Sequence, residues 1–181
     1  MRLDWVPALS RPDLLAAPVR AALEGMQSAG SPLVPALEVV EIDPALADTA
    51  ALVEASGMDM EDMANCIVIS GARAGEERVC AALVLGTTRA DVNRTVRKRL
   101  DVRKCSFMPM DEAVERTAME YGGITPLGLP ADWPVLVDAA VLGRGVIVMG
   151  SGVRRSKLRL PGALAAELPG AEELEGLGLP A

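Results

Sequence analysis

Hydrophobic residues along the chain follow two spacings, one typical of strands and one typical of helices. Short apolar runs bounded by Gly, Pro or charged residues predict β-strands. They occupy residues 36–43, 104–110, 133–142, 145–152 and 156–161. A further segment, 65–86, contains two such runs around a Gly-containing loop and predicts a β-hairpin.

The segments between these runs carry the start and stop signals of helices. Residues 10–30 begin with Ser10 as an N-cap candidate and end at Gly30, and we expect Pro18 to interrupt this helix. In 88–101, apolar residues recur at every fourth position, which places them on one face of a helix. Further helices are expected over residues 48–57, 111–121 and 162–168.

Strands outnumber helices in this order, and they pair both as hairpins and across helices. The pattern predicts an α/β fold with a mixed, partly barrel-like β-sheet surrounded by helices. We divide the chain into a helical extension over 1–35, one compact domain over 36–170 and a flexible tail over 171–181. The glycine pair Gly150 and Gly152 precedes a strand-like sequence, so a dinucleotide-binding loop is not expected there.

The composition narrows the chemistry, because the 181 residues include no histidine. This absence excludes Ser-His-Asp and Cys-His nucleophilic schemes and histidine-based metal sites. Any catalysis must depend on carboxylates, Lys, Arg, backbone amides or groups on the substrate itself. No apolar run approaches the roughly 20 residues that a membrane-spanning helix requires, so no membrane partner is expected.

The three cysteines, Cys66, Cys80 and Cys105, are widely spaced and lie within or beside apolar runs. An odd number of separated cysteines is typical of reduced thiols in the cytosol, so we expect a cytoplasmic protein. A three-cysteine zinc site is the alternative, but no CxxC pair and no histidine supports it. We therefore expect no bound metal.

The charge pattern leaves two interpretations open. The net charge of −7 argues against general nucleic-acid binding, which depends on the neutralisation of phosphates. The charge is uneven, however, since residues 89–104 hold seven basic side chains and two acids, and residues 152–159 hold four more basic ones. Such runs form either a solvated face or a local anion-binding surface.

Residues 122–126, Gly-Gly-Ile-Thr-Pro, form a rigid segment, here called the elbow, between helix-like and strand-like sequence. On the residues alone, the elbow is either a helix-stopping turn or the wall of a pocket. Adjacent glycines let the backbone approach a ligand closely, and exposed amide groups can donate hydrogen bonds to it.

The order of several motifs along the chain is similar to a known family. The motifs are DTAALVEASG, MANCIVIS, VCAALVLG, YGGITPLGLP, VLVDAAVL, VIVMGSG and KLRLPGALAAEL. From about Glu41 to about Leu168, the chain resembles the YbaK/ProRS-associated aminoacyl-tRNA editing domains. The resemblance implies that family's fold, no cofactor, and hydrolysis of the ester that joins a wrong small amino acid (Cys, Ala or Ser type) to a tRNA. The implied partners are the aminoacyl-tRNA acceptor end and, as a further candidate, an aminoacyl-tRNA synthetase.

The same resemblance assigns candidate site residues. It implies that the amides of Gly122 and Gly123 stabilise an oxyanion while Asn65 aligns the attacking group. Substrate contacts are implied for Cys66, Thr125, Pro126, Asp138, Gly150 and Gly152, and tRNA contacts for Arg154, Arg155 and Lys157. On the residues alone, Asp138 is equally a strand-end residue that binds nearby amides. Gly150 and Gly152 could equally form a tight connection between strands, and the three basic side chains could be exposed charges on a strand. The Cys66 thiol has no obvious base nearby and is expected to be inert.

Asn65 departs from the family pattern, because a lysine is usual at its position and Ser or Thr is usual at Cys66. Lysine can hold phosphate and ester groups as a cation, whereas asparagine offers only neutral hydrogen bonds, and it could simply cap the turn after Met63. Two hypotheses follow: a trans-acting deacylase, or a non-catalytic module that binds aminoacyl-adenosine or nucleotide-like ligands. A scaffold that docks a synthetase through its acidic N-terminal half is a third.

Overall fold

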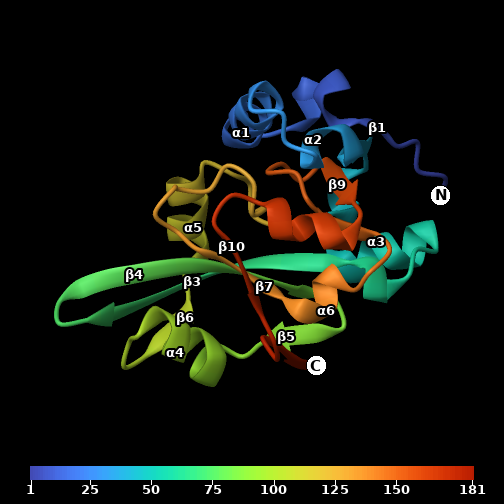
Figure 1. The fold of residues 1–181 in the computed structure, drawn as a ribbon. Helices are drawn as coiled ribbons and strands as arrows, with labels where there is room; N and C mark the ends of the chain where they lie inside the picture. The colour runs from blue at the N-terminus through green and yellow to red at the C-terminus, as the bar shows by residue number, and fades with distance from the viewer.

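The computed structural model describes residues 1–181 as strands, short helices and turns (Figure 1). The strands are β1 (Val6–Pro7), β2 (Glu38–Glu41), β3 (Ala64–Arg73), β4 (Glu76–Leu85), β5 (Thr88–Ala90), β6 (Cys105–Phe107), β7 (Val135–Asp138), β8 (Ile147–Gly150), β9 (Ser156–Leu160), β10 (Ala171–Leu174) and β11 (Gly178–Pro180). The α-helices are α1 (Ala17–Ser28), α2 (Leu33–Ala36), α3 (Thr49–Ser56), α4 (Arg97–Leu100), α5 (Met110–Thr117) and α6 (Ala139–Leu142). The 3-10 helices are η1 (Ala8–Ser10), η2 (Pro12–Leu14), η3 (Pro44–Leu46), η4 (Met60–Asp62) and η6 (Gly162–Glu167), while η5 (Val92–Val96) is a π-helix. None of these helices combines the length and the apolar character needed to cross a bilayer.

The strands form two main sheets and one small sheet. The order is β10-β7-β4-β3-β6 in the five-stranded sheet and β1-β2-β9-β8 in the four-stranded sheet, and β11 pairs with β5. Pairing is mixed, since β4 runs antiparallel to β3 and parallel to β7. An isolated bridge between Met63 and Val148 joins the two main sheets. The predicted mixed α/β fold is therefore confirmed.

The predicted hairpin is the long β3–β4 pair, and the geometry of its turn sets its register. Ala74 and Gly75 have positive φ values of 53° and 86°, as a two-residue type I′ turn requires. The two strands then pair in register over their whole length. In Figure 1 the hairpin crosses the molecule, with α1 and α2 on one side and α4 on the other.

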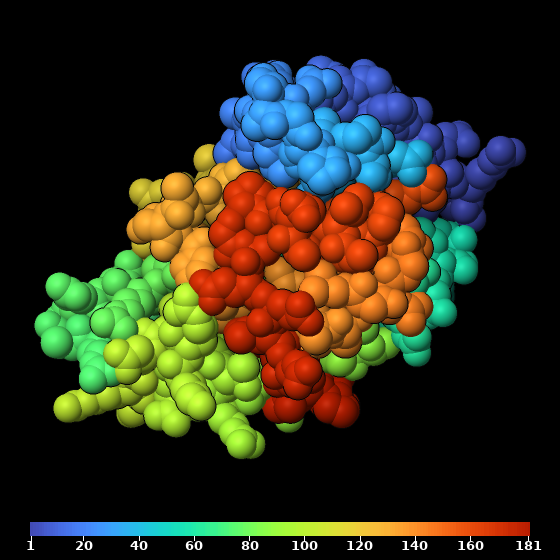
Figure 2. Space-filling model, viewed as in Figure 1, coloured from blue at the N-terminus to red at the C-terminus, as the bar shows by residue number.

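The largest hydrophobic core joins the N-terminal segment to both main sheets. It contains 25 buried residues, among which Leu14, Val19, Leu23 and Leu33 are at most 1% exposed. β1 also pairs with β2. Figure 2 shows the N-terminal residues, in blue, lying against the C-terminal segment, in red. The expected helical extension over 1–35 thus contributes to the shared core.

Three expected helices begin or end elsewhere, because local capping groups decide their limits. Pro18 does not interrupt a helix but stands in the first turn of α1, where proline is well accommodated. The helix expected over 88–101 begins only at Val92, because the Asp91 carboxylate accepts hydrogen bonds from backbone amides of the first turn. α5 ends at Thr117, well before Gly122, since the next residue, Ala118, has left-handed backbone.

Two segments near the C-terminus also differ from the prediction. Residues 133–142 are not one strand, because β7 ends at Asp138 and the chain then turns into α6. The flexible tail expected over 171–181 is instead paired, with β10 parallel to β7 and β11 antiparallel to β5. Leu177 lies between these two strands and is fully buried, so an apolar anchor holds this polar, glycine-rich segment in place.

Candidate functional site

A cavity of about 460 Å³ opens where the two main sheets meet. Its walls come from the N-terminal end of α3, the start of β3, the elbow, and strands β8 and β9. The apolar part of the lining includes Met60, Met63, Ile67, Val148 and Met149. Polar or charged side chains are contributed by Asp48, Thr49, Asn65 and Lys157. We call this cavity the cleft.

Asn65 lines the cleft from the second position of β3 and is held in place by helix α3. Its Oδ1 accepts a hydrogen bond of 3.0 Å from the hydroxyl of Thr49, the first residue of α3. α3 is fixed in turn by its N-cap, Asp48, which accepts hydrogen bonds from two backbone amides. The two N–H groups of the Asn65 amide make no hydrogen bond within the protein, so both can donate to a ligand.

Lys157, for which the resemblance implies a tRNA contact and the residues alone an exposed strand charge, also lines the cleft. The residue is 5% exposed on β9. Its Nζ donates hydrogen bonds to the carbonyls of Ala47, at 2.7 Å, and Gly122, at 3.5 Å. Burial has the largest influence on this ammonium and lowers its pKa to about 8, while the nearby Asp48 carboxylate acts in the opposite direction.

The two glycines of the elbow have different roles. Gly122 lines the cleft with left-handed backbone, at a φ of 80°, and its N–H makes no hydrogen bond to another protein group. The Gly123 N–H, in contrast, donates to the Glu120 carbonyl at 2.9 Å and closes the turn. Of the two predicted oxyanion donors, the structure leaves the Gly122 amide uncommitted and engages that of Gly123 inside the protein.

The glycine pair at 150 and 152 packs the end of β8 tightly against the elbow. A Cβ atom on Gly150 would lie 2.3 Å from the Gly123 carbonyl oxygen and 2.6 Å from that of Ile124. The Gly152 N–H donates to the same Gly123 carbonyl at 2.7 Å. Gly150 lines the cleft, whereas Gly152 and Gly123 hold its wall together from behind.

Three other predicted substrate contacts lie outside the cleft. Thr125 and Pro126, the last two residues of the elbow, are buried and do not line the cleft, and the Thr125 hydroxyl has no hydrogen-bond partner. Asp138 ends β7 next to β11 and is 3% exposed. Burial raises the pKa of its carboxyl, although backbone amides of Gly178, Ala140 and Leu177 act in the opposite direction. Asp138 thus faces the C-terminal strand.

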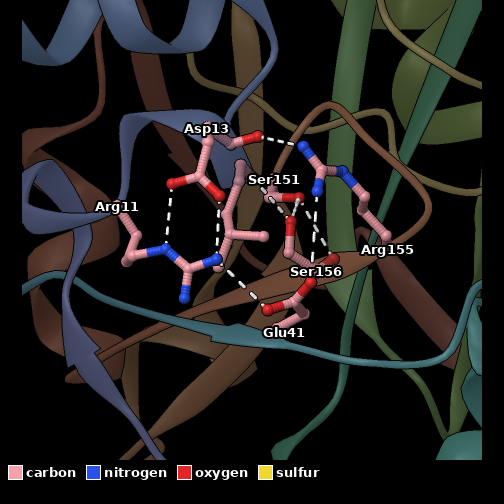
Figure 3. A network of polar contacts seen from close by, with 7 residues as sticks. Arg11, Asp13, Glu41, Ser151, Arg155 and Ser156 are labelled. Carbon is pink, nitrogen blue, oxygen red and sulfur yellow. Dashed lines mark hydrogen bonds and ion pairs between the residues drawn. The ribbon is translucent and has the colours of Figure 1, made fainter.

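Arg155 belongs to a polar network that fastens the loop between β8 and β9 to the N-terminal segment (Figure 3). Its guanidinium donates to the Asp13 carbonyl and lies 4.0 Å from the Glu41 carboxylate. Arg11 bridges the carboxylates of the same two residues, at 2.8 and 3.1 Å. Nearby, Ser156 donates to the Leu14 carbonyl and shares a further hydrogen bond with Ser151. The loop that leads into Lys157 is therefore anchored.

Arg154 ties the same loop to the residues that directly precede the elbow. Its side chain donates to the carbonyls of Tyr121, at 3.0 Å, and Pro44, at 3.3 Å. Its backbone N–H donates to the Glu120 carboxylate at 2.6 Å. Both predicted tRNA-contacting arginines are thus engaged in contacts within the protein, whereas Lys157 is enclosed in the cleft.

Two further features of the cleft concern its thiol and its rim. Cys66 lines the cleft, and burial raises the pKa of its thiol to about 12, so the thiol stays neutral near pH 7. Tyr121, the single tyrosine of the chain, is 59% exposed at the cleft and was missed from the sequence. The position of Tyr121 directly before Gly122 and Gly123 is the signal that could have identified it.

Comparison with known proteins agrees with the sequence resemblance. A family model described as the aminoacyl-tRNA editing domain matches residues 43–167. A search of curated proteins finds no match.

Several solved structures share the fold. A candidate trans-editing enzyme for prolyl-tRNA synthetase is 21% identical, with a TM-score of 0.71, over 89% of this chain and 97% of that one. The hypothetical protein APE2540 is 19% identical, with a TM-score of 0.72, over 86% of this chain and 97% of its own. A scaffold from computational epitope grafting is 19% identical, with a TM-score of 0.71, over 92% of this chain and 100% of its own.

Proposed function

The chain belongs to the aminoacyl-tRNA editing domain family, and from this premise we propose that it is a trans-acting deacylase. Its substrate would be a tRNA mischarged with a small amino acid of the Cys, Ala or Ser type. The reaction would take place in the cytoplasm, with the protein acting alone or together with an aminoacyl-tRNA synthetase. The observation that carries this proposal is the convergence of the Asn65 amide, the uncommitted Gly122 N–H and an apolar floor on one cleft.

The chemistry is ester hydrolysis without an enzyme nucleophile. A water oxygen, oriented by Asn65 and by the vicinal hydroxyl of the terminal ribose, adds to the ester carbonyl carbon. The carbonyl oxygen becomes an oxyanion, which the Gly122 N–H stabilises. Collapse of the intermediate re-forms the carbonyl and expels the ribose oxygen, which takes up the proton that the water releases. Because an aminoacyl ester is already reactive, positioning and oxyanion binding supply most of the rate.

Selectivity for small amino acids would come from the volume of the cleft. Its floor is lined by Met60, Met63 and Met149, whose flexible side chains fill irregular space. Each methylene that fits or fails to fit such a pocket changes binding by about 1–3 kcal/mol. We therefore expect alanyl and cysteinyl esters to be preferred over branched ones.

The test is deacylation of mischarged tRNA by the purified protein. Ala-, Cys- and Ser-tRNA carrying labelled amino acids should lose the label, with rates that depend on Asn65. Asn65→Ala should slow the reaction by about 10-fold or more, because one positioned amide is lost. Asn93→Ala is the matched control, since Asn93 is the other asparagine and is exposed on η5; it should change the rate less than about 3-fold. Absence of turnover with all three tRNAs defeats the proposal.

A second candidate function is a non-catalytic binding module for aminoacyl-adenosine. The observation that favours it is Asn65 itself, whose neutral amide is held by Thr49 where the resembling family carries a lysine. Asn65→Lys distinguishes the two functions. Hydrolysis gained from an inert parent would identify a binder, whereas a parent that already turns over identifies a deacylase.

A further inference from the structure

Lys157 is the only basic residue of the chain that is buried, at 5% exposed. Arg144 pairs with the carboxylates of Glu61 and Asp62, both at 2.7 Å, and Arg159 pairs with Glu38 at 2.6 Å. Lys157 is more deeply buried than either, yet it forms no ion pair and bonds only to two backbone carbonyls. A buried cation without a counter-ion is costly, so its retention calls for a compensating ligand.

The geometry directs this ammonium at the cleft. Lys157 comes from β9 of the four-stranded sheet and Asn65 from β3 of the five-stranded sheet, and both line the same cavity. An ammonium has three N–H groups, of which two donate to the carbonyls of Ala47 and Gly122. The third is available to a ligand. The anchoring of Ser156 by Ser151 and Leu14 fixes the start of the strand that carries it.

We propose that Lys157 is the cation of this editing cleft, replacing from β9 the charge that Asn65 lacks on β3. Its third N–H binds the ester carbonyl oxygen as that oxygen becomes negatively charged. During attack, the electron pair of the carbonyl moves to this oxygen, and it returns when the ribose oxygen leaves. Lys157 stays protonated and forms no covalent bond. The inference rests on the proposed function, because it assigns the charge that stabilises that reaction.

The charged and titratable groups around Lys157 agree with an anionic ligand. Asp48, at the cap of α3, favours the charged form of Lys157, while Arg154, in the loop before β9, disfavours that charged form. Tyr121 and Cys66 are the other titratable side chains of the cleft, and the thiol is neutral near pH 7. No group of the cleft neutralises Lys157 by direct contact. An oxyanion would therefore meet an uncompensated positive charge.

Binding of two stable adenosine analogues tests this inference apart from turnover. The first carries a neutral amide in place of the ester, and the second carries a phosphonate that imitates the tetrahedral oxyanion. Wild-type protein should bind the phosphonate about 100-fold more tightly than the amide, as expected for a transition-state analogue. Lys157→Met should remove this preference, because it should weaken phosphonate binding about 100-fold more than amide binding, and Lys157→Arg should keep part of it.

Lys98→Met is the matched control, because Lys98 is exposed on α4 and the analogues lack the body of a tRNA. It should leave both affinities unchanged. Since the chain has only three lysines, 98, 104 and 157, NMR of labelled lysine side chains also shows directly whether phosphonate binding raises the pKa of Lys157.

Each outcome of this experiment decides one claim. Equal wild-type affinity for the two analogues, or a phosphonate preference that survives in folded Lys157→Met, overturns the role of Lys157 while leaving the adenosine pocket intact. Failure of wild-type protein to bind either analogue overturns the pocket itself, and with it both the proposed function and the role of Lys157. Loss of the preference in Lys157→Met alone supports the inference.

Discussion

Arg155 and Lys157 are two residues apart in sequence, yet the structure gives them opposite surroundings. Arg155 is exposed, in the loop before β9, and its charge is matched by Glu41 and the Asp13 carbonyl (Figure 3). Lys157 is buried on β9 and has only carbonyl partners. The first charge fastens a loop, whereas the second remains available to a ligand. Neighbouring positions and equal charge therefore do not predict a shared role for these two residues, and burial without an ion pair is the better indicator of a ligand-binding charge.

The largest expected effect is the loss of deacylation in Lys157→Met. Removal of one oxyanion-binding group typically lowers turnover by about 100- to 1,000-fold. Hydrolysis of alanyl-adenosine, measured under single-turnover conditions, should fall by at least about 100-fold. Lys98→Met, on the exposed face of α4, should keep the wild-type rate. A wild-type rate in folded Lys157→Met would remove the functional difference between the two basic residues.

A side chain at Gly150 should destabilise the packing of β8 against the elbow, next to the strand that carries Lys157. In Gly150→Ala, the new Cβ would collide with the carbonyls of Gly123 and Ile124, at 2.3 and 2.6 Å. We expect a loss of about 2–3 kcal/mol in the free energy of unfolding, measured with denaturant. Gly145→Ala is the control, because a Cβ atom at that position would have no other atom within 4 Å; it should change stability by less than about 0.5 kcal/mol. Equal stability of the two variants would show that this close packing is not required.

The dependence of stability on pH sharpens the contrast between the buried and exposed cations. The pKa of Lys157 is about 8 in the folded protein, below its ordinary value of 10.5. Between these values the unfolded chain binds the proton and the folded protein does not, so stability rises with pH. From pH 7 to 9.5, wild type should gain about 2 kcal/mol relative to Lys157→Met. Parallel unfolding curves across this range would contradict a depressed pKa.

The smallest effect is expected at Arg155. Its interactions are exposed to solvent, and such ion pairs contribute about 0.2–1 kcal/mol. Arg155→Ala should therefore lower the free energy of unfolding by less than about 1 kcal/mol, and the loss should shrink in high salt. A loss above about 2 kcal/mol would mean that this network is a main support of the fold.

The sequence predicted elements whose local signals agree with their surroundings. The β3–β4 hairpin and the helix expected over 48–57 are confirmed, and in the structure Asp48 caps α3 and Gly57 follows it. The C-terminal strands were missed, because β10 and β11 are held by pairing with distant strands rather than by an apolar run of their own. Local propensity carries no information about such partners.

The site was predicted in part for the same reason. The family resemblance implies Asn65, Cys66, Gly122 and Gly150 as site residues, and all four line the cleft. The resemblance implies that Lys157 contacts tRNA, and nothing in its own segment indicates that Ala47 and the elbow enclose it. Asp138 lies outside the cleft because backbone amides at β11 donate to its carboxylate, and β11 lies in a segment expected to be flexible.

The most direct test of the central claim is a crystal structure of wild-type protein with the non-hydrolysable alanylamido analogue of the terminal adenosine. We expect the carbonyl oxygen of the alanyl group to lie within hydrogen-bonding distance of Lys157 Nζ, with the Asn65 amide facing the ribose. A ligand bound outside the cleft, or a Lys157 that still contacts only the carbonyls of Ala47 and Gly122, would contradict it.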